Sequence, residues 1–186
     1  CGDTTETASA VLNASGSGAA SYTSVLLTPT GVRTISGAIV AGSPLIDLNG
    51  ADVVSINGLN SGGNSLTISN TTVSATAGTS TIRMINGATG NTVTNCAVLG
   101  SSTAITTTAG GTILISTSTG GANSGNTISN NAVDPAGANL PTKGTMSLGS
   151  ASPNNTTGNL NDNNNVSHLF APRERSAPGY HPTTPT

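Results

Sequence analysis

The residues of this 186-residue chain that could perform acid–base or metal chemistry are few. Seven carboxylates and five basic side chains give a formal net charge of −2, and both histidines lie near the C-terminus. A polysaccharide lyase or hydrolase needs clustered carboxylates, as calcium ligands or as an acid/base pair, beside a basic residue. The central part of the chain offers these candidates: Asp47, Asp52, Asp134 and Asp162, with Arg33, Arg83 and Lys143.

Among these residues, the sequence context of Asp47 and Arg83 indicates most clearly which way their side chains point. Each stands between two aliphatic residues, so in a strand each side chain points away from the apolar side. If the two strands stack, Asp47 and Arg83 can pair on one face. We expect an exposed structural ion pair, which contributes less than about 1 kcal/mol, rather than a catalytic pair.

No other arrangement of residues supports catalysis or a cofactor. No Ser-His-Asp or Cys-His arrangement is credible, because both histidines lie in the C-terminal tail, and no Cys/His spacing suits a metal. The glycine pairs Gly110-Gly111 and Gly120-Gly121 carry no Lys and open no helix, so we interpret them as turns rather than phosphate loops. The sequence therefore predicts no enzyme activity, no cofactor and no metal site.

Composition excludes further classes of protein. Binding to nucleic acid requires a basic patch, and a membrane span requires about 18 or more consecutive apolar residues; the sequence shows neither. Thr (31), Ser (24), Gly (24) and Asn (21) make up more than half of the chain, and helix formers such as Glu and Lys are scarce. Low charge with regularly placed Ile, Val and Leu also argues against disorder.

The apolar residues occur in short groups separated by Gly, Asn or Ser, which is typical of many short strands joined by tight turns. These groups are Leu45–Leu48, Val53–Ile56, Leu66–Ile68, Ile82–Ile85, Ile113–Ile115, Thr127-Ile128 and Met146–Leu148.

A repeat places an Asn two residues after an apolar residue and three before a Val, with a weaker fourth copy. The repeated residues are Asn70, Asn95, Asn130 and Asn163, at intervals of 25, 35 and 33 residues. Gly-Asn introduces the last three copies, and a second strand lies between copies. A unit of one or two short strands cannot bury its apolar side alone, so the repeats must stack.

The repeated Asn suits the corner of a coil, because Asn tolerates the left-handed backbone conformation. Amides one coil apart, at roughly 4.8 Å, can also hydrogen-bond as a ladder. We therefore predict an all-β, right-handed parallel β-helix with Asn70, Asn95, Asn130 and Asn163 at equivalent corners. The alternative is a β-sandwich in which Asn marks hairpin turns.

Five stretches between about residues 30 and 166 carry a resemblance to a known family: Asp47–Leu59, Asn64–Asn70, Ser80–Cys96, Gly125–Val133 and Pro135–Gly144. They resemble the right-handed parallel β-helix repeats of large secreted bacterial surface proteins, within the broad pectate-lyase-like superfamily. Similar proteins are often exported by the type IX route and carry a C-terminal sorting domain, which this sequence does not show. The resemblance implies a fold and export, and it assigns no chemistry.

The chain divides by composition into three parts. We interpret residues 1–34 as an N-terminal cap with the first strands, and residues 35–166 as about five coils. Residues 167–186 hold four of the nine prolines and two of the three aromatic residues, which is typical of an irregular tail. Phe170 and Tyr180 are the candidate anchors of this tail, on a neighbouring subunit or along the solenoid.

The two cysteines leave alternatives open. Cys1 followed by Gly2 is compatible with an acylated lipoprotein N-terminus, but a fragment boundary or an engineered thiol explains it as well. Cys96 follows a repeated Asn and is expected to pack as a small apolar residue. A Cys1–Cys96 disulfide is compatible with an exported protein, and no spacing argument supports it.

The sequence as a whole predicts a secreted or cell-surface, non-catalytic structural or adhesive element. Its expected partners are other copies of itself, as an oligomer or fibre, or surface glycans. One alternative is a polysaccharide-binding or polysaccharide-cleaving β-helix. Another is an ice-binding face built from Thr-x-Thr pairs, although their short intervals suggest that they lie on different faces. These pairs are Thr79/Thr81, Thr92/Thr94, Thr106/Thr108 and Thr117/Thr119.

Overall fold

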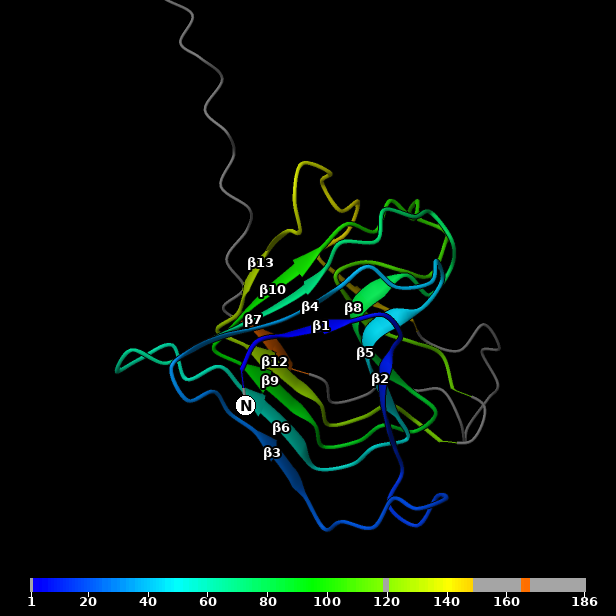
Figure 1. Ribbon diagram of the computed structural model, residues 1–186. Coiled ribbons are helices and arrows are strands. Elements are labelled where there is room, and N and C mark those ends of the chain that lie inside the picture. Colours follow the sequence, from blue (N-terminus) through cyan, green and yellow to red (C-terminus); the bar gives the residue numbers. More distant parts are fainter. Residues whose placement is uncertain (1, 119–120, 149–164, 168–186) are drawn as a thin grey trace, which may run out of the picture.

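The computed structural model describes residues 2–118, residues 121–148 and the backbone of residues 165–167. In these residues it contains fifteen strands and no helix. Each strand pairs with the strand that comes three places later along the chain. This pairing produces three five-stranded parallel sheets (Figure 1). The chain is therefore a parallel β-helix, as predicted, with five rungs, where a rung means three successive strands.

Each rung contributes one strand to each sheet, in the same order along the chain. Sheet A contains β1 (Thr4–Glu6), β4 (Val32–Gly37), β7 (Ser65–Asn70), β10 (Cys96–Gly100) and β13 (Ala132–Pro135). Sheet B contains β2 (Ala10–Asn13), β5 (Pro44–Asn49), β8 (Ser80–Ile85), β11 (Ile113–Ile115) and β14 (Thr145–Ser147). Sheet C contains β3 (Val25–Leu27), β6 (Val54–Asn57), β9 (Thr92–Thr94), β12 (Thr127–Ser129) and β15 (Asn165–Ser167).

The core is a set of aliphatic rows that run along the solenoid axis. Because the strands are parallel and in register, an inward side chain lies directly above its equivalent in the next rung. In sheet B, Ile46, Ile82 and Ile113 form one such row. Burial of each side chain of this size contributes about 1.5–3 kcal/mol. The alternation recognised in the sequence therefore has a direct cause, since every second side chain joins a row.

Sharp corners join the sheets where residues adopt left-handed backbone conformations. Asn95 and Asn130, with φ of 56° and 55°, turn the chain from sheet C into sheet A. Asn reaches this region at lower cost than other residues that have a Cβ. At the preceding corner of this kind, a Cβ on Gly58 would overlap the carbonyl oxygen of Asn95, so only glycine lets the two rungs approach.

Candidate functional site

The pair of Asp47 and Arg83 forms as the alternation predicted, but it is not exposed. The two residues are direct partners in β5 and β8. Arg83 donates from Nε to Oδ1 of Asp47 at 2.9 Å and from Nη2 to Oδ2 at 2.7 Å. Only 8% of the Asp47 side chain and 21% of the Arg83 side chain are exposed, which corrects the expectation of an exposed pair. In this bidentate geometry both carboxylate oxygens of Asp47 accept a hydrogen bond from Arg83.

Other charged groups of the coils also hold neighbouring rungs together. Asp52 Oδ1 accepts from the backbone N–H of Thr89 at 2.8 Å and from its hydroxyl at 2.6 Å. Lys143 donates to the carbonyl oxygens of Ile105 and Thr108, and partial burial lowers its pKa. Within the described residues, no three His, Cys, Asp or Glu side chains lie close enough to hold a metal ion.

The repeated Asn residues occupy two kinds of corner rather than one. Asn95 and Asn130 lie at equivalent positions between sheets C and A, next to the paired residues of β9 and β12. Asn70 instead ends β7, where sheet A leads into sheet B, and it donates to the carbonyl of Ser80 at 2.7 Å. Asn163 lies outside the described residues. The single row expected from the sequence is therefore split, because the same short pattern occurs at opposite ends of sheet A.

A ladder inside the solenoid is formed by Asn91 and Asn126, the Asn residues of two of the Gly-Asn pairs that precede copies of the repeat. Both are buried. Asn126 Oδ1 accepts from the backbone N–H and from Nδ2 of Asn91, each at 3.0 Å, and Asn126 Nδ2 donates to the carbonyl of Ala88. These amides satisfy backbone groups that the corner from sheet B to sheet C would otherwise leave unpaired.

A second ladder runs along the exit of sheet B. Asn86 Nδ2 donates to Oδ1 of Asn49 at 2.6 Å, and Asn49 Nδ2 donates to Oδ1 of Asn13 at 2.9 Å. The direction is constant: each rung donates to the rung before it. The Asn-Gly pairs at residues 49–50 and 86–87 were the available sequence signal, at one-rung spacing.

Cys96 is buried in the core as a free thiol. Its Sγ–H donates to the carbonyl of Thr94 at 3.1 Å, and burial raises the thiol pKa to about 11. A thiol of this kind is unreactive at neutral pH. Because Cys96 is a free thiol, the structure does not contain the Cys1–Cys96 disulfide; Cys1 itself lies outside the described residues, so the interpretations of the N-terminus remain predictions.

The first three Thr-x-Thr pairs do not share one face, and Thr119 of the fourth pair lies outside the described residues. Thr81 lies in sheet B, Thr92 and Thr94 lie in sheet C, and Thr106 and Thr108 lie between β10 and β11. Sheet C nevertheless has a regular outer surface. Its outward side chains in three successive rungs form two rows, both partly exposed and uncharged: Ser55, Thr92 and Thr127, then Asn57, Thr94 and Ser129.

The N-terminal end of the solenoid contains a cavity of about 640 Å³. It is bounded by the inward side of the first rung and the aliphatic residues of the second, including Ile46 and Val54. Leu12, Val25 and Ile35 line the cavity and pack against the core while partly exposed. The sequence pattern does not predict this open apolar end of the described residues, which we call the mouth.

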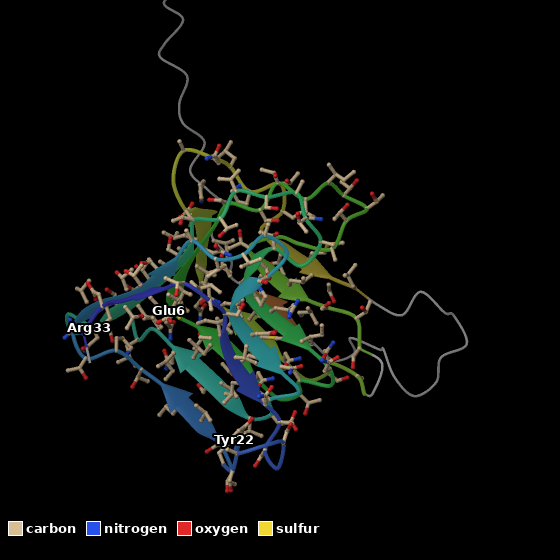
Figure 2. The ribbon with its side chains drawn as sticks, turned by 45° about the vertical axis from the view of Figure 1, so that its right-hand side comes forward. Glu6, Tyr22 and Arg33 are labelled. Carbon is tan, nitrogen blue, oxygen red and sulfur yellow. The ribbon has the colours of Figure 1, made fainter. Side chains whose placement is uncertain are left out.

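Two charged residues lie at the rim of the mouth. Glu6 on β1 is paired with Gly37 and follows the inward alternation of β4, and Arg33 on β4 also lines the cavity. Figure 2 shows Glu6 and Arg33 on the sheet A side, and Tyr22 in the segment between β2 and β3. The Tyr22 hydroxyl donates to the carbonyl of Asn13, which fastens that segment to the first rung.

The predicted tail anchors Phe170 and Tyr180 lie outside the described residues. The described residues include no helix long and apolar enough to cross a membrane. Comparisons of the chain with protein-family models, with curated proteins and with solved structures found no match. The class of protein is therefore defined by the fold itself, a parallel β-helix.

Proposed function

We propose that the chain is a non-catalytic structural or adhesive element that works outside the cell, at or near a cell surface. The observation that carries this proposal is how the coils use their ionisable side chains. Asp47 and Arg83 form a bidentate ion pair. Asp52 accepts hydrogen bonds from Thr89, and Lys143 donates to two backbone carbonyl oxygens. Each contact links one rung to the next, so these groups stabilise the solenoid.

The extracellular location rests on different support. The resemblance to repeats of secreted, type IX-exported surface proteins of the pectate-lyase-like superfamily implies export. A low net charge and a surface rich in Thr, Ser and Asn suit weak contacts with glycans. These features favour a surface element over an enzyme or a nucleic-acid-binding protein.

The proposal is tested by incubation of the purified chain with pectin, alginate and similar polymers, with and without calcium. We expect no release of unsaturated or reducing ends. Release that disappears in Asp52→Ala or Asp134→Ala, two variants outside the buried ion pair, would show a catalytic carboxylate and overturn the proposal.

The outer rows of sheet C favour a second candidate, an ice-binding face. Strand pairing spaces their hydroxyl and amide groups by roughly 4.8 Å across the sheet and by about 6.7 Å along each strand. The Thr94 and Ser129 hydroxyls lie 3.2 Å apart in a hydrogen bond, and Asn95 donates to Asn57, which fixes the array. A rigid, uncharged array of this kind can order a layer of water.

Inhibition of ice recrystallisation tests this second candidate. Thr92→Lys and Thr127→Lys place a charge in the array and should abolish inhibition. Thr67→Lys is the matched control, since Thr67 is a partly exposed residue of a central strand in sheet A. Equal loss in the control, or no inhibition by the unmodified chain, would exclude an ice-binding face.

A further inference from the structure

We propose that Asn86 is a site of spontaneous covalent modification, at which the side-chain amide is converted into a carboxylate, and that the fold protects the similar sites Asn49 and Asn57. Each of these three residues is followed by glycine. All three lie in the second and third rungs, which have a described rung on either side. The inference is independent of the proposed function, because it rests on the contacts of these three corners alone.

The reaction needs only water and the chain itself. The backbone nitrogen of the glycine loses its proton to water or hydroxide and attacks the side-chain Cγ of the preceding Asn. A bond from this nitrogen to Cγ forms, the Cγ–Nδ2 bond breaks, and the leaving nitrogen takes up a proton and departs as ammonia. Water then adds to either carbonyl of the cyclic imide and opens it to aspartate or isoaspartate. Glycine favours the attack, because it has no side chain and its backbone is permissive.

The first observation is the partner of the attacking nitrogen in the two protected sites. The N–H of Gly50 donates to the carbonyl of Ile85 at 2.8 Å, and the N–H of Gly58 donates to the carbonyl of Thr94 at 2.9 Å. Both acceptors are backbone groups of the next rung. Each nitrogen therefore becomes free to lose its proton and turn toward Cγ only when two rungs separate.

Gly87 is bound in a different way. Its N–H donates to Oδ1 of Asn123 at 2.9 Å, and the same oxygen also accepts from the N–H of Ala88 at 3.0 Å. Because the acceptor is one shared side-chain oxygen, a movement of that side chain frees the Gly87 nitrogen while the rungs stay paired. Local movements of this kind cost less free energy than the separation of paired strands.

The second observation is the space around each glycine. A Cβ on Gly58 would overlap the carbonyl oxygen of Asn95, and a Cβ on Gly50 would lie 3.1 Å from the carbonyl oxygen of Asn86. A Cβ on Gly87 would meet nothing nearer than 3.6 Å. Gly50 and Gly58 are also buried, whereas Gly87 is partly exposed and Asn86 is exposed. The corner at Asn86 therefore has the space and the access to water that the reaction needs.

Conversion of Asn86 would remove a contact between rungs. Its Nδ2 donates to Oδ1 of Asn49 at 2.6 Å, and this nitrogen is the atom that the reaction expels. A carboxylate would bring a second acceptor oxygen toward Oδ1 of Asn49, so the contact would become repulsive. Isoaspartate would also add a methylene group to the main chain at a corner where φ is 59°. Modification should therefore loosen the chain between β8 and β9.

Peptide mapping of the full chain after incubation in mildly alkaline buffer tests the inference. Trypsin cleaves after Arg83 and so separates Asn86 from Asn49 and Asn57, and mass-spectrometric fragmentation of each peptide locates the product. In the native chain, product should form at Asn86 at least several-fold faster than at Asn49 or Asn57. In the same chain unfolded in guanidinium chloride, the three rates should become similar, because each site is then only an Asn-Gly pair.

Two variants of Asn123 test the assigned cause. Asn123→Ala removes the acceptor of the Gly87 N–H. Asn123→Asp is the matched control, because it loses the same side-chain donor to the carbonyl of Ser116 but keeps an acceptor oxygen. The ratio of the rate at Asn86 to the rate at Asn57 corrects for a general loosening of the fold. We expect this ratio to rise several-fold in Asn123→Ala and to stay close to that of the unmodified chain in Asn123→Asp.

Four results would overturn the inference. The native chain could react equally at the three sites, or faster at Asn49 or Asn57 than at Asn86. Asn86 could stay intact in the native chain while the unfolded chain reacts. Finally, the ratio of the two rates could be the same in Asn123→Ala as in the unmodified chain. None of these results bears on the proposed function, which the polysaccharide assay tests separately.

Discussion

Removal of one partner from the Asp47–Arg83 pair leaves the other charge largely out of water. Arg83→Met should therefore lower the free energy of unfolding by about 3 kcal/mol, since a mostly buried carboxylate loses its counter-ion. The double variant Asp47→Leu with Arg83→Met should recover most of that loss. Denaturant unfolding measures both, and a loss below about 1 kcal/mol in the single variant would show that the pair behaves as an exposed one.

The Cys96 thiol should be protected by the fold. With its pKa raised to about 11, little thiolate is present at pH 8, so a disulfide reagent should react far more slowly with the native chain than with the unfolded chain. A raised acid pKa contributes stability below the unfolded value of about 9, and this contribution is lost as the pH rises toward 11. Equal rates for native and unfolded chain would contradict the buried position.

At the scale of the element, the ladders predict an order of effects between two Asn residues. Asn126→Val removes the acceptor of two Asn91 donors and should cost about 2–3 kcal/mol of stability. Asn130→Val places a β-branched residue at a left-handed corner and should cost about 1–2 kcal/mol. Thermal or denaturant unfolding ranks them, with Asn130→Gly as a control that relieves the corner. The reverse order would show that the corners, rather than the buried amides, hold the rungs.

Strands were the part of the fold that sequence reasoning could predict, because inward aliphatic residues alternate wherever a rung is buried. The corners were harder. Asn95 and Asn130 are separated by 35 residues, the same interval as the paired Thr92 and Thr127, whereas Asn70 and Asn95 are separated by only 25. An interval shorter than one rung places Asn70 at another corner, and a pattern of six residues cannot distinguish these two kinds of corner.

The candidate surfaces were not visible in the sequence for a related reason. The rows of sheet C combine Thr with Ser and Asn, so only one of the four Thr-x-Thr pairs, Thr92/Thr94 in β9, belongs to them. The mouth depends on which residues lack a neighbouring rung, which is a property of the assembled solenoid. Register converts scattered residues into rows, and register becomes known only when the rungs are stacked.

At the scale of the whole molecule, the structure is a stack whose interior rungs are covered on both sides and whose first rung is covered on one. Such a solenoid gains stability from each added neighbour, and its ends are its weakest parts. The rungs that have a neighbour on both sides are therefore expected to be the most stable part of the described chain.

Hydrogen exchange followed by mass spectrometry tests this account most directly. Amides of β7, β8 and β10 should be strongly protected, because each strand is paired on both sides. Amides of β1, β2 and β3, which pair on one side only within the described residues, should exchange faster. Fast exchange in β7, β8 and β10, or equal protection of β1, β2 and β3, would contradict the account.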